Sequence, residues 1–162
     1  MLVLTVLELW PVTITYRTNK LIHAPSERIW KVLNASSFER KWFRNEDGSA
    51  YLTRLDLSVG QSNGQGIRRD LAFVPIGRWQ ESVVHFEPER RLVLQARQSG
   101  PFAFYEIKYQ FLPIDERDYR LSVEYTAQLR GLKNKIHYRQ LKQTMASTMR
   151  YSLLGIKALS GG

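Results

Sequence analysis

The residues in this sequence that could most readily take part in chemistry are polar side chains within apolar, strand-like segments. Glu81 and His85 lie four residues apart and would form an acid–base pair if both faced the interior. Arg69 shares a face with apolar neighbours. It either meets an anionic ligand group inside the protein or extends its charged end outward at the sheet margin. Tyr105 adds a phenol, which needs a hydrogen-bond partner when it is buried. These four residues are the polar groups that an enzyme could use here.

Two registers are open for the strand that carries Glu81. If Trp79 and Val83 face inward, the carboxylate and the nearby histidine also line the interior. If Val84 and Phe86 face inward, both of those polar groups are exposed to solvent. We favour the second register, because it places the last apolar residue of the segment inside.

Signatures of metal and cofactor binding are missing from the sequence. His23, His85 and His137 are far apart in the chain and lack the spacing of metal ligands. The glycines between residues 60 and 66 lead into a strand instead of a helix, so they do not form a phosphate cradle. The chain has no cysteine, which excludes disulfides, thiolate ligands and cysteine nucleophiles. We expect no metal and no cofactor.

A larger set of residues favours binding over catalysis. Side chains alternate along a strand, so one face of each predicted strand lines the interior and the final helix covers it. Methionines on that helix suit a cavity that accepts varied apolar shapes. The residues predicted to line a ligand cavity are Ile67, Arg69, Leu71, Phe73, Tyr105, Ile107, Tyr109, Tyr125, Met145 and Met149.

Hydrophobic periodicity predicts the elements that hold these residues. A period of two predicts strands over residues 13–22, 52–59, 67–74, 78–86, 92–97, 102–112 and 119–129. Two short helices are expected between the first two strands, one capped by Ser26 and one over Phe38 to Phe43. A period of 3.6 predicts a long helix from Leu132 to Leu159. Its apolar stripe comprises Tyr138, Leu141, Met145, Met149, Ser152, Ile156 and Leu159.

This order of elements, together with several short motifs, resembles the SRPBCC superfamily, the helix-grip proteins related to START lipid-transfer domains and polyketide cyclases. The motifs are Ile22-His-Ala-Pro25, Ile29-Trp30-Lys-Val-Leu33, Phe38 with Trp42, Gly64-Gln-Gly66, and Phe86-Glu-Pro88 with Arg91-Leu92. The resemblance implies an α+β fold in which a curved seven-stranded antiparallel sheet grips the C-terminal helix around an apolar cavity. It implies no shared catalytic set. We expect one domain over residues 1–162, with residues 1–11 as an arm or edge strand.

Positive charge is concentrated at the C-terminal end. The chain has 24 basic and 15 acidic residues, a net charge of +9, and no Asp or Glu from Tyr125 onward. Arg139, Arg150 and Lys157 would lie on one flank of the helix, where they suit an anionic membrane surface or form a solvated face. Few aromatic residues accompany them, which disfavours nucleic acid as a partner. The first twelve residues lack the basic leader of an export signal, so we expect a cytoplasmic protein, free or peripheral to a membrane.

The sequence therefore predicts a helix-grip protein that binds or transports a small hydrophobic molecule, such as a lipid, a polyketide or an isoprenoid, without performing chemistry on it. One alternative is a cyclase or dehydratase-like enzyme that acts on a polyketide-type substrate. Another is an interaction module that uses its basic helix at an anionic membrane surface.

Overall fold

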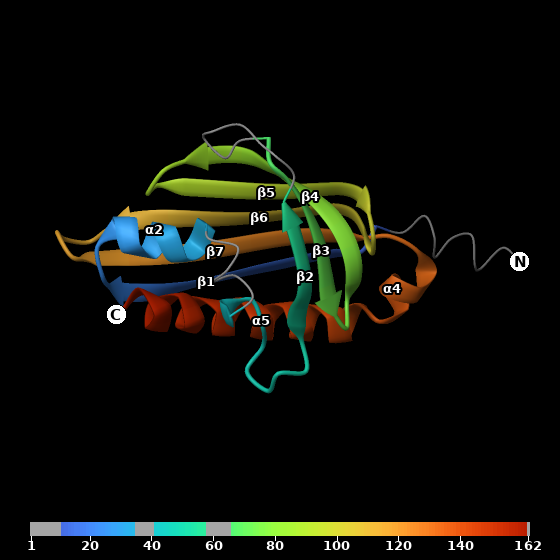
Figure 1. Cartoon of the computed structure of the whole chain (residues 1–162). Coiled ribbons are helices and arrows are strands. Elements are labelled where there is room, and N and C mark those ends of the chain that lie inside the picture. The colour runs from blue at the N-terminus through green and yellow to red at the C-terminus, as the bar shows by residue number, and fades with distance from the viewer. Residues whose placement is uncertain (1–10, 35–40, 58–65, 162) are drawn as a thin grey trace, which may run out of the picture.

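A computed structural model describes residues 11–34, 41–57 and 66–161 of the chain. Within them, seven strands precede a pair of C-terminal helices (Figure 1). The strands are β1 (Thr13–His23), β2 (Tyr51–Leu57), β3 (Arg68–Val74), β4 (Gly77–Glu87), β5 (Arg91–Ser99), β6 (Phe102–Pro113) and β7 (Asp118–Leu129). The helices are α2 (Ser26–Asn34), α4 (Leu132–Ile136) and α5 (Tyr138–Ser160).

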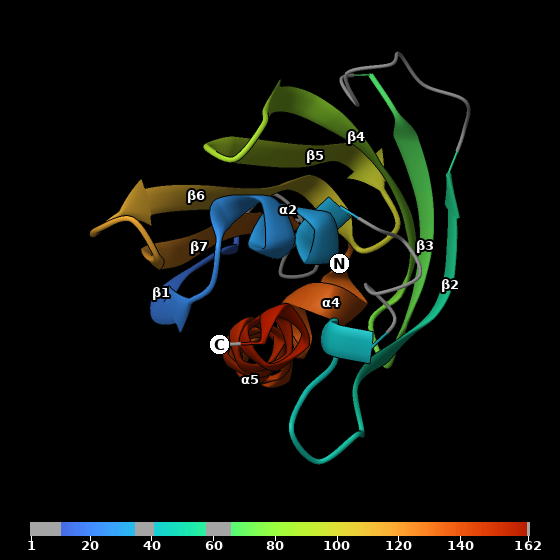
Figure 2. The ribbon, with the colours of Figure 1, turned by 60° about the vertical axis from the view of Figure 1, so that its left-hand side comes forward.

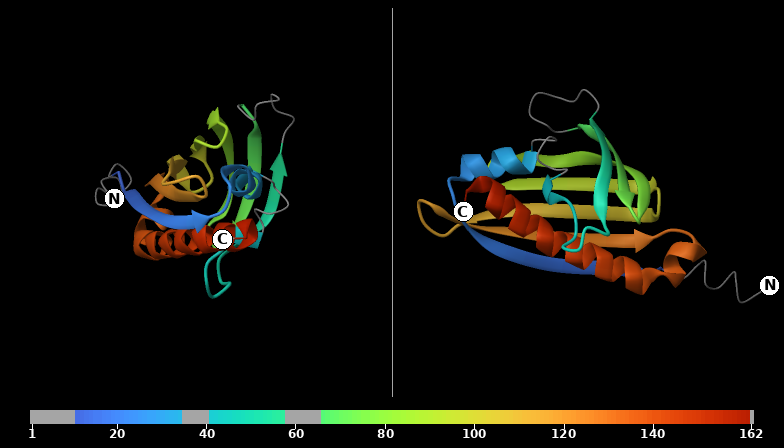
Figure 3. Two further views of the ribbon diagram at one scale, coloured as in Figure 1. Left: turned by 90° about the vertical axis from the view of Figure 1, so that its left-hand side faces the viewer. Right: turned by 60° about the horizontal axis from the view of Figure 1, so that its bottom comes forward.

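The strands form one antiparallel sheet in the order β1-β7-β6-β5-β4-β3-β2. Figure 2, seen nearly along the axis of α5, shows the sheet curling around α2 and α5. Figure 3 shows α5 running across the open side of this curved sheet. The helix packs mainly along the edge strand β1 and against α2. This arrangement confirms the predicted helix-grip α+β fold.

The central strands β6 and β7 follow the alternation that the sequence predicts. On β6, Tyr105, Ile107 and Tyr109 are buried on the concave face. Glu106 and Lys108 lie on the opposite face, where Lys108 Nζ is 2.8 Å from Glu106 Oε1. Burial of the apolar face against the helices fixes the register, because a shift by one residue would expose every apolar side chain on the strand.

The register that we favoured for β4 is wrong at Glu81, which is buried, and at Val84, which is 40% exposed, and it is correct at His85 and Phe86. Trp79, Glu81 and Val83 are buried on the concave face. The pairing of β4 with β5 then shifts between Val83 and His85, which marks a β-bulge. Beyond this bulge His85 is exposed, while Phe86 is half-buried and packs against the core. The bulge changes whether odd-numbered or even-numbered residues face inward. The strand therefore follows one predicted register before the bulge and the other after it.

The predicted long helix is divided at His137, whose backbone angles are φ −90° and ψ 17°. Its first five residues form α4, and α5 begins at Tyr138. Tyr138 is 38% exposed and does not belong to the buried stripe. Most of the stripe is confirmed, because Met145, Met149, Ser152 and Ile156 are buried. The break lets the first turn of α5 leave the core.

The C-terminal half of α5 packs closely on Trp42. A Cβ atom on Gly155 would lie 2.7 Å from the Trp42 Cβ, so only glycine fits there without movement. The Trp42 indole is buried and donates a hydrogen bond from Nε1 to the Val32 carbonyl oxygen at 3.2 Å. Lys41 and Trp42 are the described helical residues of the second predicted short helix. The rest of that helix up to residue 40, and residues 1–10 of the predicted arm, lie outside the described residues.

Candidate functional site

A buried ion pair occupies the concave face of β3 and β4. Arg69 and Glu81 are directly opposite each other in the antiparallel pairing. The Arg69 Nε lies 2.9 Å from Glu81 Oε1, and the side chains are 10% and 2% exposed. Trp79 donates a hydrogen bond from Nε1 to Glu81 Oε2 at 3.1 Å. Arg69 therefore takes the inward of its two predicted orientations, and its partner is a carboxylate of the protein itself.

Tyr105 lies near this ion pair on the concave face. Its ring centroid is 6.0 Å from that of Trp79 and 5.0 Å from that of Phe102. Burial, followed by the negative charge of Glu81, raises the pKa of Tyr105 well above its usual value. The phenol consequently keeps its proton at neutral pH. It can donate a hydrogen bond to an oxygen atom but cannot serve as a base there.

Aromatic rings form a nearly continuous surface across the concave face. Neighbouring ring centroids in this series lie 5.0 to 6.3 Å apart, within the range of favourable edge-to-face and tilted contacts. In order of contact the rings belong to Phe43, Phe73, Trp79, Phe102, Tyr105 and Tyr125. Such a surface presents flat, apolar faces with a few hydroxyl groups at the ring edges.

Three hydroxyl groups are buried without a hydrogen-bond partner among the described residues: Tyr125 Oη on β7 and, on α5, Thr148 Oγ1 and Ser152 Oγ. Burial also raises the pKa of Tyr125, so its phenol keeps its proton. The sequence predicts Tyr125 in the cavity and Ser152 on the helix stripe, whereas Thr148 was not predicted to lie in the interior. The available signal was the four-residue spacing from Thr148 to Ser152, which puts both side chains on one face of the helix.

The structure places the predicted cavity residues in the protein interior, with one partial exception. Ile67 is only partly buried, just before β3, although it packs against the core. Arg69 is buried in its ion pair. The other eight are all buried: Leu71, Phe73, Tyr105, Ile107, Tyr109, Tyr125, Met145 and Met149. Their role in binding a ligand stays a prediction.

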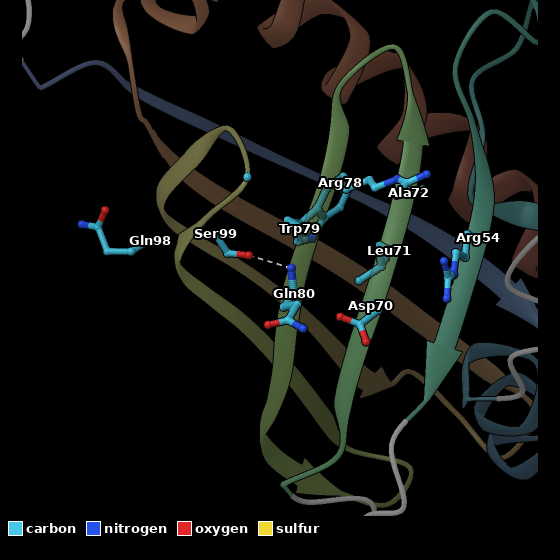
Figure 4. Close-up of a pocket in the computed structure, with 10 residues that line it drawn as sticks. Arg54, Asp70, Leu71, Ala72, Arg78, Trp79, Gln80, Gln98 and Ser99 are labelled. Atoms are coloured by element: carbon cyan, nitrogen blue, oxygen red, sulfur yellow. Dashed lines mark hydrogen bonds between the residues drawn. The ribbon is translucent and has the colours of Figure 1, made fainter.

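A polar groove of about 400 Å³ lies on the outer side of β3 and β4 (Figure 4). Its residues include Asp70 and Gln80, which alternate with the inward Leu71 and Trp79. The turn between β5 and β6 closes one side. There the Gln80 backbone N–H donates to Ser99 Oγ at 2.7 Å (Figure 4). This groove is separated from α5 by the sheet, so it is not the predicted cavity, although Leu71 borders it.

A second groove, of about 290 Å³, lies between the β3–β4 turn and the helices α4 and α5. Its lining residues are Pro75, Ile76, Lys133, Asn134, His137, Gln140, Leu141 and Thr144. Leu141 and Thr144 lie within about one helical turn of the buried Met145. This groove therefore opens at the surface within about one helical turn of the buried Met145.

Comparison with known proteins places this geometry among solved structures. No protein-family model and no curated protein matches the chain. The aromatase/cyclase Zhui from Streptomyces superposes with a TM-score of 0.73 at 11% identity, over 93% of this chain and 94% of that one. A START superfamily protein from Mycobacterium smegmatis gives 0.68 at 11%, over 91% and 97%. The chain has the START/SRPBCC helix-grip fold. Norcoclaurine synthase from Thalictrum flavum is also similar, with 0.65 at 16% identity over 94% and 96%.

On the surface of this helix-grip protein, the C-terminal helices expose both cations and apolar side chains. Arg139 and Arg150 are exposed, whereas Lys157 is half-buried. Ile136 at the end of α4 is 65% exposed and is followed closely by the exposed Tyr138. No helix among the described residues is long and apolar enough to cross a membrane. The described residues also contain no group of three or more histidine and acidic side chains that could hold a metal.

Proposed function

We propose that this helix-grip protein binds a small hydrophobic molecule between the concave face of its sheet and α5. The observation that carries the proposal is the ion pair of Arg69 and Glu81, buried within an aromatic surface. Burying two charges costs free energy that their attraction barely recovers, and apolar residues of similar size often replace such a pair without loss of stability. A pair kept in this position is better explained by a role in shaping the interior of a binding site than by stability.

The surrounding residues favour an apolar, partly planar ligand. Aromatic faces of Trp79, Phe102 and Tyr105 offer broad contact area, and lipid, polyketide or isoprenoid-like molecules all fit this chemistry. Met145 and Met149 on α5 are flexible side chains that can rearrange around a guest molecule. The groove beside Leu141 provides an entry route from the surface.

Native mass spectrometry of the purified protein tests this proposal by detecting a co-purified apolar ligand. Titration with an apolar fluorescent probe then measures affinity in two variants. Tyr109→Ala, which truncates a buried concave tyrosine, should weaken binding at least several-fold. Tyr138→Ala truncates an exposed tyrosine on α5 and serves as the matched control. Unchanged binding in Tyr109→Ala, with its thermal unfolding still cooperative, would contradict the assignment.

Catalysis of a cyclase-like reaction is the second candidate, and Tyr105 supports it. Its protonated phenol near Glu81 can donate a hydrogen bond to the carbonyl oxygen of a bound polyketone, as an electrophilic catalyst does. Incubation with a poly-β-ketone substrate should then yield cyclised product, and Tyr105→Phe should reduce turnover while leaving probe binding intact. Absence of product with the unmodified protein would remove this candidate and leave the binding proposal standing.

Ligand exchange at an anionic membrane would explain the exposed groups of the C-terminal helices. Ile136 and Tyr138 present apolar surface beside Arg139, a combination that suits the interface of an anionic bilayer. Co-sedimentation with vesicles that contain anionic lipid should exceed that with neutral vesicles. Ile136→Ser together with Arg139→Ser should reduce it, while Arg54→Ser on β2 should not. Binding that ignores lipid charge would exclude this surface as a membrane site.

A further inference from the structure

The three unpartnered hydroxyl groups lie on the two walls that enclose the interior. Thr148 and Ser152 are one helical turn apart, and both side chains are buried on the inward face of α5. Tyr125 belongs to the concave face of β7, one of the strands that α5 contacts. We call these three groups the hydroxyl set. Each is at most 1% exposed, and none has a partner among the described residues.

Such groups are unusual in a helix. A serine or threonine inside a helix can donate to the carbonyl oxygen four residues earlier, and Ser160 does so to the Ile156 oxygen at 2.7 Å. Thr148 and Ser152 make no comparable bond, although both are fully buried. Their donors and acceptors are thus withdrawn from water without replacement, an arrangement that proteins normally avoid. The hydroxyl set has hydrogen-bonding capacity left for a further molecule.

The set is uncharged, and the buried cation of the concave face is already engaged. Arg69 is paired with Glu81, so the interior offers an anionic ligand group no free positive charge among the described concave residues. A hydroxyl group both donates and accepts hydrogen bonds, which matches an alcohol, a phenol or a ketone. A bare hydrocarbon would leave all three groups unpaired.

Resting on the proposed function, we infer that the bound molecule is a neutral, oxygenated hydrophobe. Its hydroxyl or ketone oxygen hydrogen-bonds to at least one member of the hydroxyl set, Tyr125 on β7 or Thr148 and Ser152 on α5, while its ring or chain packs on the aromatic surface. The inference predicts selectivity between ligands of equal size that differ only in one polar group.

Four tricyclic probes that share the fluorene skeleton test this selectivity: fluorene, 9-fluorenol, 9-fluorenone and the somewhat larger fluorene-9-carboxylate. Calorimetric titration of the full chain should show 9-fluorenol and 9-fluorenone binding at least tenfold more tightly than fluorene, with the carboxylate weakest. The double variant Thr148→Val with Ser152→Ala keeps side-chain size and should bring the oxygenated probes to within about threefold of fluorene. Ser160→Ala, whose hydroxyl is internally bonded, is the matched control and should change no affinity ratio.

The possible outcomes distinguish this inference from the proposed hydrophobic binding on which it rests. Equal affinity for fluorene and 9-fluorenol, as expected if the hydroxyl set holds only buried water, overturns the inference and leaves hydrophobic binding in place. Tightest binding of the carboxylate also overturns it and directs attention to Arg69. Failure of all four probes to bind overturns both. Should the double variant unfold, Tyr125→Phe alone tests the same ratio.

Discussion

Two groups of buried polar side chains face the interior, and they differ in one respect. On β3 and β4, Arg69, Glu81 and Trp79 are joined to each other by an ion pair and a hydrogen bond. On β7 and α5, Tyr125 and the helix hydroxyls have no partner among the described residues. The members of the first group are paired with one another, whereas the second group has unused hydrogen-bonding capacity.

The difference follows from the cost of burial. A charge without a partner is far more costly inside a protein than a hydroxyl without one. Charged residues therefore have to be paired before any ligand arrives, and they can only tune the local field around Tyr105. Hydroxyl groups can stay unpaired at modest cost, so they are the groups that a ligand can complete. On the proposed function, the ion pair would therefore shape the interior and the hydroxyl set would recognise the ligand.

The largest effect on stability should come from removing one partner of the buried Arg69–Glu81 ion pair. Glu81→Leu leaves the Arg69 guanidinium buried opposite an apolar side chain, and we expect a loss of about 3–5 kcal/mol in unfolding free energy. Urea denaturation measures it. Adding Arg69→Met should recover most of the loss, because the unpaired charge is then removed. Glu106→Leu, which breaks the more exposed pair with Lys108, should cost no more than about 1 kcal/mol. Similar losses for both carboxylates would mean that the inner pair is not truly desolvated.

An alkaline titration tests whether the phenols of Tyr105 on β6 and Tyr125 on β7 are shielded from water. Burial raises the pKa of Tyr105 and of Tyr125, so the unfolded chain loses these protons at lower pH than the folded protein. Stability should be fully present below pH 10, the ordinary tyrosine value, and should fall above it, by up to about 1.4 kcal/mol per pH unit for each tyrosine. Thermal unfolding between pH 8 and 11 measures the slope. The double variant Tyr105→Phe with Tyr125→Phe should flatten it, and an unchanged slope would contradict the buried assignment.

The smallest effect on stability should come from removing the unpaired hydroxyl groups of α5. Thr148→Val and Ser152→Ala delete hydroxyls that have no partner to lose, so the unfolding free energy should stay constant or rise by up to about 1 kcal/mol. Ser160→Ala deletes a bonded hydroxyl and should cost about 1 kcal/mol. Chemical denaturation of the three variants makes the comparison. A destabilised Thr148→Val would mean that its hydroxyl has a partner in solution.

The sequence predicted most of the sheet because burial on one face imposes a period of two that is visible in the residue types. The described strand limits differ from the predictions by only a few residues, and the inward residues of β6 and β7 are as expected. Glu81 was misplaced because a bulge adds one residue to the count, and no residue type marks that position. The alternation of apolar and polar residues alone cannot show at which residue the inward-facing positions of a strand shift by one.

The helix shows a second limit of pattern reasoning. Tyr138 fits the stripe by its spacing, yet the helix is interrupted at His137 and Tyr138 is 38% exposed. Thr148 was overlooked because threonine is ordinarily counted as a polar, outward residue. Its neighbour Met149 was assigned to the interior correctly. Buried polar residues are the class that hydrophobic patterning is least able to find.

The contact between Gly155 and Trp42 has a mechanical consequence. With no side chain at Gly155, the helix approaches the Cβ atom and the backbone of Trp42 closely, and a larger residue there would have to displace them. The opposite end begins at the break beside His137 and carries the surface groove. If α5 moves to admit a ligand, we expect the displacement to be largest at the end beside α4, away from this close contact. A bulky residue at position 155 should displace α5 even without a ligand.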